Sequence, residues 1–178
     1  HIHINLGSGF SSSYQNAFIA AQDFPNVRVV DSRNLSCGQG LLVLKALELS
    51  RTMENLDDMV ATLNEYAEKV ETSFVLDRLD YMVKGGRCST VAALGANLLN
   101  LKPCIELRDG KMGVGKKYRG HYDKCLTSYI HERLNGREDI DRSILILEYT
   151  QVDEVCMKAV KEEIAAAGVF DTVLTAVA

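Results

Sequence analysis

The sequence predicts an α/β fold, with a parallel-sheet α/β domain at residues 1–71 and an α+β domain with a mixed or antiparallel sheet at residues 72–178. In the first part, short apolar strands alternate with helices, the order typical of a parallel sheet with crossover helices. In the second part, the turn dipeptide Asp109-Gly110 separates two apolar segments and predicts an antiparallel hairpin. We therefore expect a domain boundary near residue 71.

The first predicted elements are a strand, a turn and a helix. Apolar and polar residues alternate over residues 2–6, as in a strand with one buried face. A Gly-Ser-Gly turn at residues 7–9 ends the strand, and the serines at 11–13 can cap a helix that continues to Ala21. This arrangement gathers free N–H groups and hydroxyls at one point, where an anion such as a phosphate or a carboxylate is favoured.

The remaining elements follow from hydrophobic periodicity and turn residues. The helix at residues 41–50 is apolar nearly all round, so we expect it to be buried on most sides. The other predicted strands lie at residues 27–31, 73–76, 143–149 and 172–177, the hairpin arms at 103–107 and 114–118, and the other helices at 56–69, 79–83, 91–99, 122–134 and 152–167.

Composition excludes several classes of protein. The hydrophobic fraction of 47% and charged fraction of 25% are those of a globular protein, and a net charge of −4 offers no general attraction to nucleic acid. The longest apolar run, at residues 41–44, is too short to span a bilayer. The five cysteines are scattered without a C-x-x-C pair, so we expect no metal site and a reducing cytoplasm.

A second interpretation of the Gly/Ser turn is a dinucleotide site. Gly7-x-Gly9 after a strand, with Asp31 at the end of the next strand, has two of the three glycines and the acid of that fingerprint. Ser12 stands where the third glycine is needed for close packing of helix and strand. An α/β enzyme that uses a dinucleotide therefore stays an alternative. A serine nucleophile is less favoured, because no histidine lies in a recognisable catalytic pattern.

Two basic features are candidate binding groups. Arg87 follows two glycines and precedes Cys88-Ser89, where an arginine can bind an anion through two parallel hydrogen bonds. The segment from Lys111 to Lys124 gathers several basic residues in an acidic protein. It is either an ordinary solvated face or a surface that docks an acidic or phosphorylated partner.

The same segments, in the same order, resemble the DegV family of bacterial fatty-acid-binding proteins. Residues 7–17 match the family motif S-S-x-L-S-G-T-Y-Q-x-A, and residues 27–32 match V-x-V-x-D-S. Residues 77–89 match D-x-L-x-Y-L-x-x-G-G-R-I-S, and residues 98–103 match L-L-x-I-K-P. Asp109-Gly110-Lys111 and Tyr118-Arg119-Gly120 follow as further matches.

The resemblance implies two α/β domains with a ligand cleft between them that holds a long-chain fatty acid such as palmitate, stearate or oleate. Such proteins are not enzymes and need no cofactor. They present the acid to the catalytic subunit of a fatty acid kinase, which forms the acyl-phosphate for phospholipid metabolism. The resemblance implies a cytoplasmic protein that binds no nucleic acid, has no transmembrane segment and makes at most transient contact with a membrane surface.

The matched positions assign roles to individual residues. Ser8 and Arg87 are expected at the fatty-acid carboxylate, with support from Gly9, Phe10 and Ser11. Lys117 and Arg119 are expected to face the partner. Residues proposed beside the acyl chain, or in the apolar core, are Phe10, Leu41, Leu94, Leu98, Leu99 and Ile105.

The chain also departs from the family pattern. Gly7 and Ser12 replace a serine and a glycine, and Phe10 replaces a leucine. The upstream T-S-x-P-S segment, with a carboxylate-binding threonine, and the downstream H-x-G-P-G segment, with a histidine, are missing. Because the chain also starts without methionine and ends on an apolar strand, we expect a fragment that lacks N- and C-terminal segments.

Overall fold

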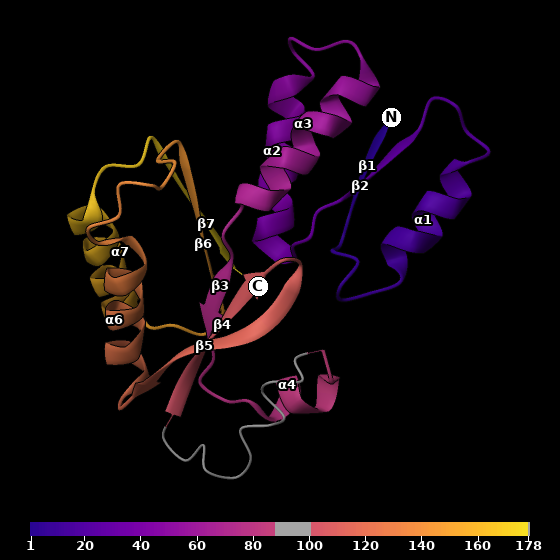
Figure 1. Ribbon diagram of the computed structural model, residues 1–178. Coiled ribbons are helices and arrows are strands. Elements are labelled where there is room, and N and C mark those ends of the chain that lie inside the picture. Colours follow the sequence, from indigo (N-terminus) through magenta and orange to yellow (C-terminus); the bar gives the residue numbers. More distant parts are fainter. Residues whose placement is uncertain (88–100, 178) are drawn as a thin grey trace. The chain divides into compact units, whose positions relative to one another are not determined.

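The computed structural model describes residues 1–87 and 101–177 of the chain (Figure 1). These residues form two compact units. Within the described ranges, the first unit comprises residues 1–73, 82–87 and 106–113, and the second comprises 74–81, 101–105 and 114–177. The predicted mixture of parallel and antiparallel sheets is confirmed. The domain boundary near residue 71 stays a prediction.

The first unit is built on a parallel strand pair. Strand β1 (Ile2–Asn5) pairs with β2 (Arg28–Asp31), and helix α1 (Ser13–Ala21) makes the crossover between them. The register sets Asn5 beside Asp31, so both strands end at the same edge. The turn that follows β1 is thereby brought next to the carboxyl end of β2.

Helices α2 (Ser36–Leu49) and α3 (Leu56–Lys69) complete the core of this unit. The buried cluster joins β2 to both helices through Val30, Leu42, Leu63 and Ala67. Asn55 caps α3, because its side-chain oxygen accepts hydrogen bonds from the N–H groups of Asp57, at 2.8 Å, and Asp58, at 3.3 Å. The amphipathic pattern of α3 therefore gives the expected packing.

Helix α2 corrects two expectations. It begins at Ser36, five residues before the predicted start, and only Gly38 and Leu42 are buried in it. A Cβ atom at Gly38 would lie 2.4 Å from Oδ1 of Asn34 and 2.3 Å from Oγ1 of Thr72, so glycine lets the first turn pack closely. The helix is not buried on most sides: Val43 and Leu47 are 51% and 56% exposed, because its packing covers one face.

A three-stranded sheet has the order β3 (Ser73–Val75), β4 (Leu101–Arg108), β5 (Lys111–Arg119). The N–H of Leu107 donates to the carbonyl of Thr72 at 3.0 Å, and that of Leu76 to Pro103 at 3.4 Å, as in an antiparallel pair. Strands β4 and β5 form the predicted hairpin. Its turn residues Asp109 and Gly110 have φ angles of 51° and 70°, which an Asp-Gly pair adopts readily.

The second unit also contains a parallel pair, β6 (Ile144–Tyr149) and β7 (Thr172–Val177), joined through α7 (Glu154–Ala167). Helix α6 (Tyr122–Leu134) packs with α7 around a buried cluster made of Ile130, Leu134, Cys156, Val160 and Ile164. Asp153 caps α7 by accepting a hydrogen bond from the N–H of Cys156 at 2.7 Å. A short helix, α4 (Asp80–Gly85), precedes Arg87. The helix predicted at residues 91–99 lies outside the described residues.

Candidate functional site

Ser8 and Asp31 form the centre of the candidate anion site. The N–H of Ser8 donates to Oδ1 of Asp31 at 3.0 Å, and the Ser8 hydroxyl donates to Oδ2 at 2.5 Å. The N–H of Arg33 also donates to Oδ1, at 2.9 Å. Asp31 therefore ties the turn after β1 to the end of β2, and Ser8 itself remains exposed at this edge.

The two glycines of the turn allow close approach of other backbone segments. A Cβ atom at Gly7 would lie 2.9 Å from backbone atoms of Arg33 and Asn34, and one at Gly9 would lie 2.1 Å from the carbonyl oxygen of Gly110. The N–H of Gly7 donates to the carbonyl of Asn34 at 2.9 Å. The Gly-x-Gly pattern thus allows close backbone packing within the unit, and Asp31, the acid of the dinucleotide alternative, accepts hydrogen bonds from this turn.

A network of buried polar side chains lies directly after the end of β2. The hydroxyl of Ser32 donates to the carbonyl of Asn34 at 3.0 Å and accepts from the Asn34 N–H at 3.1 Å. The hydroxyl of Thr72 donates to Oδ1 of Asn34 at 2.7 Å. Ser32 is fully buried and Asn34 is 2% exposed, so these hydrogen bonds replace the water that both side chains lose.

Arg33 is the cation of this edge. It adopts a left-handed backbone with φ of 52°. Its guanidinium pairs with Glu68 at 3.0 Å and lies 3.9 Å from Asp109 at the hairpin turn. These acids share the positive charge of Arg33.

The predicted supporting residues take structural positions around Ser8. Phe10 is half-buried, and its N–H donates to the carbonyl of Gly7 at 3.0 Å. Ser11 accepts a hydrogen bond from the N–H of Ser13 at 3.2 Å, at the start of α1. Ser12, at the N-cap position, makes no side-chain capping bond. Ser11 is thus the serine that satisfies the start of the helix.

Arg87 lies after the end of α4 and is exposed. Its Nη1 donates to the carbonyl of Gly85 at 2.7 Å, and the intervening Gly86 has φ of 67°. Within residues 1–87 and 101–177, no hydrogen bond joins Arg87 to Ser8. That Ser8 and Arg87 bind one carboxylate therefore stays a prediction.

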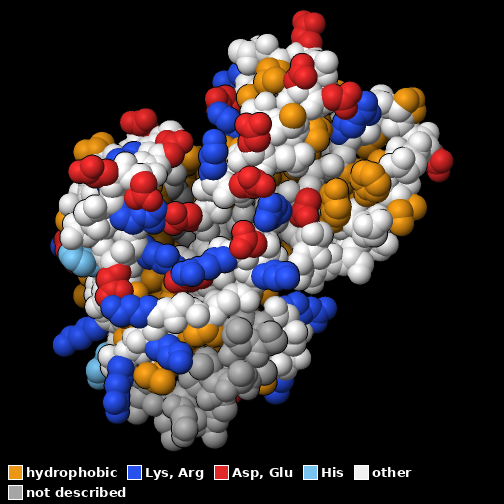
Figure 2. Space-filling model, in the orientation of Figure 1, with side chains coloured by type: hydrophobic (Ala, Val, Ile, Leu, Met, Phe, Trp, Pro, Cys, Tyr) orange, Lys and Arg blue, Asp and Glu red, His pale blue; other side chains and the backbone are white. Residues whose placement is uncertain are grey.

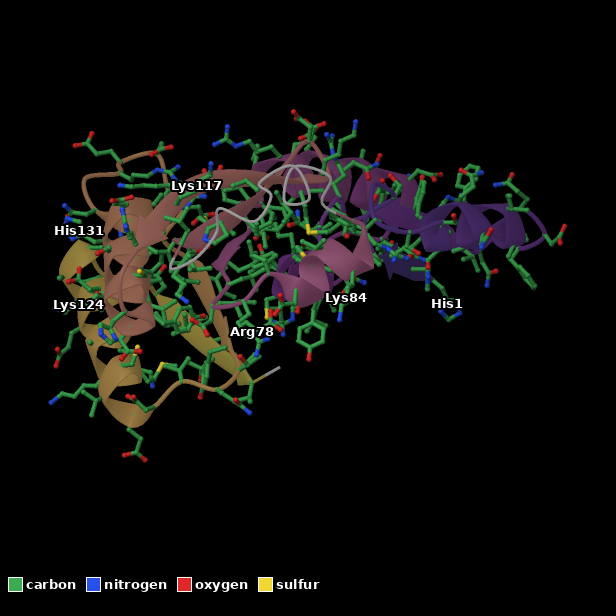
Figure 3. The ribbon with its side chains drawn as sticks, turned by 90° about the horizontal axis from the view of Figure 1, so that it is seen from below. His1, Arg78, Lys84, Lys117, Lys124 and His131 are labelled. Carbon is green, nitrogen blue, oxygen red and sulfur yellow. The ribbon has the colours of Figure 1, made fainter. Side chains whose placement is uncertain are left out.

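Lys117 and Arg119 are both exposed on β5, where alternate side chains share a face. Figure 3 labels Lys117. The opposite face of β5 carries Lys116 and Tyr118, which both contact the carboxylate of Glu132 on α6. The ion pair with Lys116 lowers the pKa of Glu132, and burial raises the pKa of Tyr118.

Helix α6 carries further basic side chains. Lys124 and His131 lie on α6, and Figure 3 labels both. Lys and Arg side chains lie over this part of the face shown in Figure 2, with acidic side chains between them. Lys117 and Arg119 form the exposed basic face of β5.

A surface groove of about 510 Å³ lies elsewhere, along α7. Its lining residues are Tyr149, Val152, Glu154, Met157, Lys158, Lys161, Glu162 and Ala165. None of the predicted site residues lines it.

Of the residues proposed beside an acyl chain, Ile105 is fully buried in its own unit and Leu41 is half-buried. Leu94, Leu98 and Leu99 lie outside the described residues. Across the part of the chain that the structure covers, no group of three or more His, Cys, Asp and Glu side chains is placed to hold a metal ion. No described helix is long and apolar enough to cross a bilayer.

The partnership of Asp31 with Ser8 was missed from the sequence, although a signal for it exists. The carboxyl ends of parallel strands meet at one edge of a sheet, so an acid that ends one strand lies beside the turn after its neighbour. The motif match gave Ser8 a role at the ligand and gave Asp31 none. Arg33 carries no comparable signal.

The chain is similar to known proteins over nearly its whole length. The family model described as uncharacterised protein, DegV family, matches residues 1–171. A DegV domain-containing protein of Clostridium acetobutylicum is 37% identical over 122 residues, covering 67% of this chain and 44% of that protein.

Two solved structures share the fold. One is a fatty acid binding DegV family protein from Streptococcus agalactiae, with a TM-score of 0.81 and 26% identity over 98% of this chain and 63% of that one. The other, from Thermus thermophilus, is described as fatty acid binding of a DegV family protein, with a TM-score of 0.78 and 27% identity over 99% of this chain and 63% of that one.

The chain thus spans less than two thirds of the length of each of these relatives. The family match itself extends across both compact units, including the Ser8 turn, Asp31 and β5. The chain belongs to the DegV family.

Proposed function

We propose that this chain binds a long-chain fatty acid and presents its carboxylate to a separate kinase, without catalysing the reaction itself. The observation that carries the proposal is the similarity, over 98–99% of the chain, to two solved relatives that are described as binding fatty acids. The motif positions shared with the family support the same function. The kinase partner would form the acyl-phosphate in the cytoplasm, for use in phospholipid synthesis.

The headgroup would bind at the Ser8 turn. A carboxylate taken out of water needs several hydrogen-bond donors, because an unpaired buried charge costs several kcal/mol. Ser8 supplies an exposed hydroxyl beside the start of α1, and Gly9, Phe10 and Ser11 shape the turn around it. The exposed guanidinium of Arg87 would be a second group that binds the carboxylate.

The acyl chain would supply most of the favourable free energy. Each buried CH₂ group contributes about 0.8 kcal/mol of favourable free energy. The acyl chain of palmitate therefore contributes on the order of 12 kcal/mol before the costs of association, and that of stearate or oleate slightly more. A ligand of this kind needs no cofactor. The expected binding energy is therefore large enough for a carrier that holds its lipid during transfer.

A displacement titration tests the binding proposal directly. The intact protein is loaded with a fluorescent long-chain acid, and unlabelled palmitate, stearate and oleate are added. We expect each acid to displace the probe, while a short-chain acid such as butyrate does not, because it buries too few CH₂ groups. Failure of all three long-chain acids to displace or bind would overturn the proposed function.

Lys117 and Arg119 are proposed to face the kinase, because both are exposed on one face of β5 and each contributes a positive charge. We expect Lys117→Glu with Arg119→Glu to slow association with the kinase subunit by about tenfold or more, and least at high salt. Surface plasmon resonance at two ionic strengths measures this. Lys158→Glu with Lys161→Glu on α7 is the matched control, and equal rates for the two double variants would contradict the assignment.

A further inference from the structure

The hydroxyl of Ser8 is already committed in the structure. A serine hydroxyl has one proton to donate. The Ser8 hydroxyl donates this proton to Oδ2 of Asp31, and the distance between the two oxygens is 2.5 Å. This distance is typical of a charge-assisted hydrogen bond to a carboxylate. The N–H of Ser8 is committed as well, to Oδ1 of the same side chain. Ser8 therefore presents lone pairs, and no proton, to an incoming anion.

We infer that Asp31 is a positioning residue that competes with the bound carboxylate for the Ser8 hydroxyl proton. The inference rests on the proposed function, in which Ser8 contacts the fatty-acid headgroup. When the ligand binds, the hydroxyl turns from Asp31 to the ligand carboxylate. The affinity for the charged headgroup is then set by the difference between two similar hydrogen bonds.

Asp31 is held in place independently of the hydroxyl. Its Oδ1 accepts the backbone N–H groups of Ser8 and Arg33, and β2 holds its own backbone beside Asn5. The carboxylate therefore keeps its position when the hydroxyl turns away. The hydroxyl is the part of this arrangement that can change without moving the backbone.

Asp31 also places a negative charge next to the ligand carboxylate. Arg33, whose N–H donates to Asp31, directs its guanidinium to Glu68 and Asp109. A like charge within a few ångströms disfavours the anion. Both effects lower the affinity for a fatty-acid anion relative to an uncharged headgroup, which suits a carrier that must release its ligand to a partner.

Asp31→Asn separates this role from a purely structural one. The amide oxygen of asparagine can still accept the two backbone N–H groups, while its NH₂ group faces the Ser8 oxygen as a donor. The Ser8 proton is then free for the ligand, and the negative charge is gone. We expect the intact protein to bind palmitate about tenfold more tightly, which corresponds to about 1.4 kcal/mol. Binding of hexadecanol, which has the same chain without a charge, should change less than about twofold.

Three variants control the measurement. Asp31→Ala removes the acceptor for both N–H groups and should weaken the binding of both ligands. Asp58→Asn removes the same charge from α3 without touching the turn and should change neither. In Ser8→Ala with Asp31→Asn, the part of the gain that depends on the released proton should be lost. Asp31→Ser, a second neutral variant with an acceptor, replaces Asp31→Asn if thermal denaturation shows that the latter does not fold.

The outcomes separate the two levels of the proposal. If wild-type protein binds palmitate and the neutral variant binds it no more tightly, the competition by Asp31 is overturned while the proposed function stands. Equal loss of palmitate and hexadecanol binding in that variant would show a structural role alone and overturn it as well. If folded wild-type protein binds neither ligand, the proposed function fails, and this inference with it.

Discussion

At the scale of single residues, the candidate site depends on the contacts between the turn after β1 and its neighbours. Ser8 and Asp31 come from segments 23 positions apart and meet because β1 and β2 pair in parallel. Gly9 makes this meeting compatible with the hairpin turn, since any larger residue would collide with the carbonyl oxygen of Gly110. The identity of each of these residues is therefore constrained by its neighbours as well as by a ligand.

Ser8→Ala is the first substitution to make at this scale. In the Asp31→Asn background, where no carboxylate competes for the hydroxyl proton, removal of the hydroxyl should weaken fatty-acid binding by about 1.5–3 kcal/mol, the range for a hydrogen bond to a charged group, and in wild type by less. A displacement titration measures the change. Ser12→Ala is the matched control, because Ser12 makes no side-chain capping bond. An affinity that Ser8→Ala leaves unchanged in the Asp31→Asn background would show that another side chain binds the carboxylate.

The motif match gave Ser8 a role at the ligand, and only the dinucleotide alternative gave a role to Asp31. The resemblance marks which residues are shared, but it carries no information about which hydrogen bonds they make with each other. Strand pairing does carry that information, through the register of β1 and β2. For Arg87, the sequence context suggests an anion site, and in the structure its guanidinium donates a hydrogen bond to the carbonyl of Gly85.

At the scale of elements, β5 and α6 are joined by a charged cluster under the exposed basic face of β5. Glu132 on α6 accepts a hydrogen bond from the Tyr118 hydroxyl at 3.0 Å and pairs with Lys116. Lys116 also lies 5.5 Å from the centroid of the Tyr118 ring. These contacts fix the strand that carries Lys117 and Arg119.

The cluster makes a prediction about pH. The hydrogen bond from Lys116, which is the largest cause, lowers the pKa of Glu132 in the folded protein. A lowered folded pKa adds stability that is present above the unfolded value, near 4.5, and is lost as the pH falls through the folded pKa. Glu132→Gln should therefore be less stable than wild type at pH 7, and the gap should close as the pH falls below about 4.

Thermal denaturation of both proteins between pH 7 and pH 3 measures this gap. Asp139→Asn provides a comparison, because the pKa of Asp139 is lowered by Arg137 in a loop that does not join β5 to α6. A stability difference between wild type and Glu132→Gln that stays constant over the whole range would contradict the link.

Periodicity predicted most elements because each has one clear apolar face or a strong turn. The Asp-Gly turn placed the hairpin, and Asn55 marked the start of α3. For helix α2, the apolar pattern predicted a start near Leu41 and burial on most sides, whereas the helix begins at Ser36 and only Gly38 and Leu42 are buried in it. The first turn of this helix packs closely on Asn34 and Thr72 at Gly38, a contact that a one-dimensional pattern does not show.

At the scale of the whole molecule, the chain belongs to the DegV family, as the individual motifs suggest. The DegV model extends over residues 1–171, and two solved fatty-acid-binding relatives share the fold over 98–99% of the chain. The chain corresponds to 63% of each of those structures. The lipid-carrier function proposed for it therefore depends on a ligand that the intact protein should hold when it is purified.

Native mass spectrometry of the purified protein, beside its denatured mass, tests this central claim most directly. We predict an additional mass equal to a C14–C18 fatty acid that is present in the native spectrum and lost on denaturation. Extraction of the same sample should release the free acid. A native mass equal to the denatured chain mass, unchanged after incubation with palmitate, stearate or oleate, would contradict the proposal that this protein carries a long-chain fatty acid.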